Sequence, residues 1–74
     1  MAYSNLLKKY YDPSNNSALY LTNLQQIYKY LNAGAEKDLV DILYTDTKRE
    51  CLVFVFKKTQ FMADLYEKWQ NHEL

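Results

Sequence analysis

The chain has 74 residues, of which 49% are hydrophobic and 24% charged, with one glycine and one proline. A chain of this length forms a single domain, and this composition excludes collagen-like, linker-type and wholly disordered sequences. Nine basic residues balance nine acidic ones, and this balance argues against a polyanion mimic and against a strongly basic nucleic-acid binder.

The single cysteine, Cys51, cannot form an internal disulfide, which is typical of proteins in reducing surroundings. No hydrophobic signal segment follows Met1, and no apolar run approaches the ~18 residues that a membrane span needs. We therefore expect a cytoplasmic protein that does not contact membranes.

Between residues 2 and 11, leucines and tyrosines recur at helical spacing and predict a short N-terminal helix. These residues are Leu6, Leu7, Tyr10 and Tyr11. The polar cluster at residues 12–17 contains the only proline and is typical of a loop. We expect residues 1–17, this helix and loop, to precede a core of residues 18–71 within one domain of residues 1–74.

A short apolar run at residues 18–21 predicts a strand. Thr22 and Gln25 then match a capping box, in which the threonine hydroxyl accepts a backbone N–H and the glutamine side chain reaches back. Gly34 follows the predicted helix, where a left-handed residue is needed. The apolar stripe expected on this helix consists of Leu24, Ile27, Tyr28 and Leu31.

Two further apolar segments, residues 39–44 and 51–56, predict a β-hairpin. The second segment is apolar on both faces, as a central strand requires. Thr59 is placed to cap a final amphipathic helix that ends near Asn71.

These elements predict an α+β fold, with an N-terminal helix followed by β-α-β-β-α. The β-α-β unit should cross over with a right hand, which leaves room for the third strand between the first two. We therefore expect a three-stranded antiparallel sheet of order 1-3-2, with two helices on one face.

Along residues 51–56, one face of the sheet carries Leu52, Phe54 and Phe56, and the other carries Cys51, Val53 and Val55. Both sets are apolar, so one can pack on the two helices and the other, on the second face, needs a cover. Either the N-terminal helix packs against it, or a second copy or another protein does. The two alternatives are compatible if two chains exchange their N-terminal helices.

Few side chains suit catalysis or metal binding. His72, the only histidine, lies near the end of the chain, and Cys51 lies in an apolar strand where a cysteine is usually a small buried hydrophobe. Asp38 and Asp41 could share a face, but two acids are too few for a metal site. A single glycine cannot build a phosphate-binding loop. We predict a non-enzymatic protein without metal or cofactor.

Eight tyrosines are the unusual feature of the composition, and tyrosine is enriched at protein interfaces. Four of them are expected to place their hydroxyls in water and to contact a partner: Tyr10, Tyr11, Tyr30 and Tyr44. Tyrosine beside lysine also resembles a surface for single-stranded nucleic acid, although the zero net charge weighs against this use. The lysines for that alternative are Lys8, Lys9, Lys57 and Lys58.

Several of these features together resemble a family of small domains of unknown function from Firmicute bacteria and their phages and plasmids. The resemblance covers residues 19–70 and rests on Tyr28-Lys29-Tyr30-Leu31, Gly34, Val53-Phe54-Val55-Phe56 and Thr59. It implies a βαββα core and an origin in a phage or mobile element, and it supplies no activity.

We predict a small non-enzymatic accessory factor that occupies a surface of a host protein or of a second copy, in the latter case as a homodimer. Inhibition of a host defence protein would be one instance. The alternative is a weak nucleic-acid-binding protein.

Overall fold

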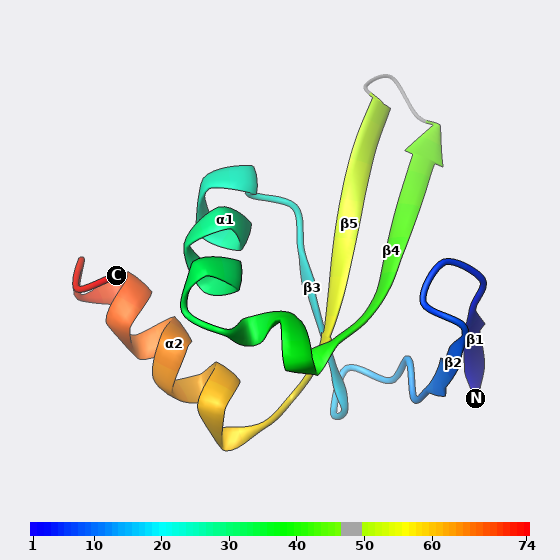
Figure 1. Ribbon diagram of the computed structural model, residues 1–74, viewed down its shortest axis with the longest axis horizontal. Coiled ribbons are helices and arrows are strands. Elements are labelled where there is room, and N and C mark those ends of the chain that lie inside the picture. The colour runs from blue at the N-terminus through cyan, green and yellow to red at the C-terminus, as the bar shows by residue number, and fades with distance from the viewer. Residues whose placement is uncertain (47–49) are drawn as a thin grey trace.

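The computed structural model describes the backbone of residues 1–46 and 50–74, and the side chains of residues 1–45 and 52–74. The described residues form a two-stranded sheet, a three-stranded sheet and two α-helices. Figure 1 shows both helices on one side of the three-stranded sheet and the two-stranded sheet on the other. The elements are β1 (Ala2–Ser4), β2 (Lys9–Tyr11), β3 (Ala18–Leu21), α1 (Leu24–Asn32), a short 3₁₀ helix η1 (Ala35–Asp38), β4 (Leu39–Asp46), β5 (Glu50–Lys57) and α2 (Gln60–Gln70).

β5 lies between β3 and β4 and pairs antiparallel with both. The predicted order of the three strands, with the most apolar segment in the middle, is therefore confirmed. Side chains alternate along β5, so Phe54 and Phe56 pack towards the helices and Val55 packs on the opposite face.

The main core lies between this sheet and the two helices. Tyr30 of α1, Phe56 of β5 and Met62 of α2 are its largest fully buried side chains. The rings of Tyr30 and Phe56 meet edge to face, with centroids 6.5 Å apart. Gln26 donates a hydrogen bond of 2.9 Å from Nε2 to the Tyr30 hydroxyl, so these two buried polar groups satisfy each other.

The N-terminal segment is a β-hairpin, and the predicted N-terminal helix is wrong. β1 pairs with β2 so that Tyr3 lies opposite Tyr10. The Lys8 backbone N–H donates to the Ser4 carbonyl at 2.7 Å, and Lys8 adopts a φ of 57°, which a right-handed helix does not allow. An isolated ten-residue helix is marginal in water, whereas tyrosine favours strands. The molecule therefore has two sheets where the sequence predicted one.

Helix α1 starts one residue later than the predicted capping box implies. Asn23 caps it by accepting the backbone N–H groups of the first turn at 3.0 and 3.2 Å, so the predicted cap at Thr22 is wrong. The expected apolar stripe is wrong in part, because Leu24 and Tyr28 are exposed while Ile27 is buried. The buried side of α1 is instead centred on the Gln26–Tyr30 pair.

Two residues at helix ends have the roles that the sequence predicted. Gly34 ends the α1 region with a φ of 101°, a left-handed conformation that glycine adopts without steric cost. Thr59 caps α2, because its hydroxyl accepts the Met62 backbone N–H at 3.3 Å. The same hydroxyl donates to Asp38 Oδ2 at 2.8 Å, which ties the start of α2 to η1.

Candidate interaction surface

A buried carboxylate in β4 holds the hairpin against the three-stranded sheet. Asp41 is 5% exposed; its Oδ1 accepts the Ser4 hydroxyl at 2.6 Å, and its Oδ2 accepts the Tyr11 hydroxyl at 2.8 Å. The backbone N–H of Ile42 donates to Oδ1 at 2.8 Å. A buried charge is tolerated only with such donors, so this carboxylate fixes β1 and β2 to β4.

This arrangement changes the acidity of Tyr11. Burial, together with the hydrogen bond to Asp41 and the negative charge of that carboxylate, raises the pKa of Tyr11 to about 12. The hydroxyl therefore keeps its proton at neutral pH and remains a donor to Asp41.

Tyr11 also covers part of the second face of the three-stranded sheet, opposite the helices. It packs against a small buried cluster formed by Ala18, Val40 and Val55. Of the two alternatives that the sequence left open, cover by the chain's own N-terminal segment holds for this part, with a hairpin in place of the helix. Tyr20 and Leu43 on the same face remain exposed, so the cover is partial.

The outward side of the hairpin presents apolar and aromatic side chains to solvent. Tyr3 and Tyr10 pack against each other across the two strands, with ring centroids 4.7 Å apart and ring planes tilted by 59°, and they are 46% and 69% exposed. Met1 and Leu6, at the two ends of β1, are also exposed. We call these four residues the hairpin surface. Large apolar side chains exposed together on one short hairpin are typical of interaction sites.

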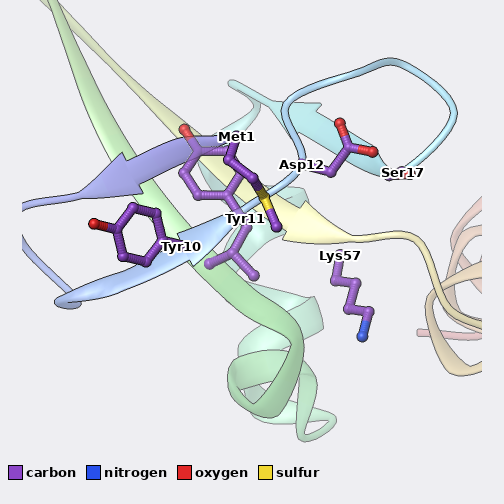
Figure 2. Close-up of a pocket in the computed structure, with 7 residues that line it drawn as sticks. Met1, Tyr10, Tyr11, Asp12, Ser17 and Lys57 are labelled. Atoms are coloured by element: carbon purple, nitrogen blue, oxygen red, sulfur yellow. The ribbon is translucent and has the colours of Figure 1, made fainter.

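A pocket of about 290 Å³ opens between the hairpin, β4 and the end of β5, and Figure 2 shows the side chains around it. Its apolar lining comes from Met1, Tyr11 and Val40. Tyr10 borders it on one side, and Asp12 and Lys57 lie on the other with their charged groups pointing apart (Figure 2). The volume is at the lower limit of ligand pockets, so it suits one bulky side chain better than a whole cofactor.

The four tyrosines predicted to bind a partner lie at three separate places. Tyr10 belongs to the hairpin surface, and its neighbour Tyr11 is the half-buried donor to Asp41. Tyr30 is fully buried in the core, so the expectation that its hydroxyl reaches water is wrong. Tyr44 is exposed on β4, far along the strand from the hairpin.

The lysines predicted for nucleic-acid binding come from two segments near the hairpin. Lys8 lies in the hairpin turn and Lys9 in β2, and both are exposed. Lys57 lines the pocket. The Lys58 ammonium donates a hydrogen bond to the backbone carbonyl of Asn15, which uses part of its donor capacity.

Sequence reasoning missed Tyr3 and the anchoring role of Asp41. The available signal was alternation: in the hairpin Tyr3 and Tyr10 point outward, while Ser4 and Tyr11 point to the sheet. Two such triplets separated by a short turn are typical of a hairpin. Nothing local connects Asp41 to Ser4, which is 37 positions away.

Few other side chains among the described residues suit catalysis or metal binding. The side chain of Cys51 lies outside the described residues, so the prediction that it is a small buried hydrophobe stays a prediction. His72 lines a second cavity of about 500 Å³ between α1 and the end of α2. Asp38 and Asp41 serve different contacts, with Thr59 and with the hairpin. Among the residues with described positions, no three His, Cys, Asp or Glu side chains are placed to hold a metal ion.

Comparisons with protein-family models, with curated proteins and with solved structures gave no match. The resemblance to small phage and plasmid domains therefore stays a prediction. Neither helix of the described chain is long and apolar enough to span a bilayer. The function is accordingly inferred from the geometry of the hairpin and its pocket.

Proposed function

We propose that this chain is a small non-enzymatic protein-binding factor that contacts its partner through the hairpin surface. The observation that supports this most directly is the contact between the Tyr3 and Tyr10 rings, which are exposed to solvent on a hairpin that Asp41 fixes to the sheet. The partner is a host protein or a second copy of the chain. This use agrees with an accessory factor of a phage or mobile element acting in the cytoplasm, such as an inhibitor of a host defence protein.

The physical argument concerns preorganisation. A tyrosine ring offers a large rigid contact area and keeps its hydroxyl hydrated at the edge of an interface. Because the rings of Tyr3 and Tyr10 already pack against each other, binding would cost less side-chain entropy than it would for separate rings. An isolated two-stranded hairpin is marginally stable at best, so the attachment through Asp41 is what allows the hairpin to present them.

Capture of partners from a lysate of the organism that encodes the chain tests the proposal. The wild-type chain is compared with a double variant carrying Tyr3→Ser and Tyr10→Ser. Tyr28→Ser is the matched control, since Tyr28 is 63% exposed on α1, on the other side of the sheet (Figure 1). We expect a protein that wild type and Tyr28→Ser retain equally, and that the double variant retains about tenfold less.

Sedimentation of the same three proteins tests the second copy as partner. A homodimer formed through the hairpin surface gives a dimer mass for wild type and Tyr28→Ser, and a monomer mass for the double variant. The proposal is ruled out if capture or dimerisation survives the double substitution. It is equally ruled out if wild type stays monomeric at high concentration and retains no protein.

A second candidate function is binding of single-stranded nucleic acid. The observation that favours it is that the Tyr3–Tyr10 pair lies on the same hairpin as the exposed Lys8 and Lys9, which combines stacking with positive charge. This function predicts that a fluorescent oligonucleotide binds at low salt and is released as salt increases. Absence of binding at low salt excludes it.

A further inference from the structure

Resting on the proposed function, we infer that the pocket shown in Figure 2 holds one bulky apolar or aromatic side chain of the partner, and that Lys57 pairs with an acidic residue beside that side chain. The partner segment is thus an acidic peptide with an apolar anchor. The pocket adjoins the hairpin surface, because Met1 and Tyr10 belong to both, whereas Lys57 belongs to the pocket alone.

The lining of the pocket supports an apolar anchor. Val40 is buried in the sheet, and Tyr11 is held in place by its hydrogen bond to Asp41, so the inner part is preformed. Met1 is almost fully exposed at the entrance, and a methionine side chain adapts its shape to what it contacts. A volume of about 290 Å³ accommodates the side chain of a leucine or a phenylalanine rather than a larger ligand.

The charges around the pocket support an acidic neighbour. The Asp12 carboxylate accepts the Ser14 backbone N–H at 3.0 Å, and that bond, with the hydroxyls of Ser17 and Ser14, lowers the pKa of Asp12. Asp12 is thus ionised, with its carboxylate bonded within its own loop and pointing away from Lys57 (Figure 2). Within the described residues Lys57, in contrast, has no carboxylate partner, which leaves its ammonium available to an incoming acid.

The charged side chains in the wider surroundings of the pocket are also mostly positive. Lys8 and Lys9 of the hairpin are exposed, while the Asp41 carboxylate is buried and accepts hydrogen bonds from the hairpin. Among the described side chains of residues 1–17 and Lys57, the exposed charges are therefore three lysines against Asp12, although the whole chain is neutral. Such complementarity selects an acidic segment over a basic one. A polyphosphate chain fits less well, because the pocket is mainly apolar.

Fluorescence anisotropy with three labelled peptides tests the inference. The first peptide has a central phenylalanine flanked by glutamates, the second has serine in place of the phenylalanine, and the third has lysines in place of the glutamates. We expect saturable binding of the first peptide only, and binding about tenfold weaker with Lys57→Glu, a change equivalent to about 1.4 kcal/mol. Lys68→Glu, the same charge reversal on the exposed side of α2, should leave binding unchanged.

The inference is overturned if the first peptide does not bind at about 1 mM protein, which would mean an affinity too weak to be useful. It is also overturned if the lysine peptide binds as well as the first peptide, or if Lys57→Glu binds the first peptide as tightly as wild type does. Binding of a thymidine oligonucleotide that competes with the first peptide and depends on Lys57 overturns it as well, in favour of nucleic acid. Lys57→Glu also separates this inference from the proposed function. If lysate capture depends on Tyr3 and Tyr10 but not on Lys57, the hairpin surface binds a partner and the pocket does not.

Discussion

Asp41 is 5% exposed and accepts hydrogen bonds from three donors, the hydroxyls of the distant Ser4 and Tyr11 and the backbone N–H of the adjacent Ile42. Asp41→Asn keeps the shape of the side chain but removes the charge and turns one acceptor into a donor that faces the Tyr11 hydroxyl. We expect the free energy of unfolding to fall by about 1–3 kcal/mol, measured by urea denaturation. Asp64→Asn on the exposed side of α2 is the control, with a change within about 0.5 kcal/mol. Equal effects of the two substitutions would contradict an anchoring role for Asp41.

Tyr11 makes the stability depend on pH in the alkaline range. Its pKa is about 12 in the folded protein, against 10.0 for an ordinary tyrosine, so the folded state holds the proton more tightly than the unfolded state. The stabilisation is fully present below pH 10 and is lost as the pH rises through about 12. Denaturation of wild type and Tyr11→Phe across this range should show a steeper loss for wild type. Parallel curves would mean that Tyr11 titrates as an ordinary tyrosine.

At the scale of elements, the start of α2 illustrates a local and testable interaction. The Thr59 hydroxyl accepts from Met62 and donates to Asp38, so Thr59→Ala removes a cap and a tertiary hydrogen bond together. We expect a loss of about 1–2 kcal/mol in the free energy of unfolding, measured by chemical denaturation followed by circular dichroism. Thr59→Ser keeps both hydrogen bonds and should retain most of the stability. If serine is as damaging as alanine, the methyl group rather than the hydroxyl carries the effect.

The sequence predicts an element well when neighbouring residues determine it, and poorly when a contact with a distant residue does. The central strand, the left-handed Gly34 and the Thr59 cap follow from neighbouring residues, and all three are confirmed. The N-terminal hairpin depends on Ser4 reaching Asp41 across 37 positions, and the helical spacing of residues 2–11 gave no sign of that contact. For the same reason the sequence identified Tyr10 and Lys57 as candidate site residues but could not show that they border one pocket.

At the scale of the whole molecule, the fold is less compact than its length allows. The radius of gyration is 12.3 Å, whereas a compact domain of this length has a value of about 11 Å. Figure 1 shows why: the two-stranded sheet sits to one side, and the β4–β5 ribbon extends beyond β3 and α1. The hairpin is therefore an arm at one side of the molecule, and it contacts β4 at few positions.

This shape predicts that the hairpin can open without unfolding of the rest. Replacing both hydroxyl donors, with Ser4→Ala and Tyr11→Phe, leaves the Asp41 charge buried with only the Ile42 N–H as donor, which favours exposure of that carboxylate to water. Opening would uncover the apolar cluster at Ala18, Val40 and Val55. We expect backbone amides of residues 2–11 to exchange hydrogen at least about tenfold faster, while those of β5 keep the protection of the global core. Binding of a hydrophobic dye should rise in parallel.

Tyr28→Phe is the control, because it removes an exposed hydroxyl from α1 and should change neither hydrogen exchange nor dye binding. If β5 loses protection to the same extent as the hairpin, the two sheets unfold as one cooperative unit and the arm has no independent motion.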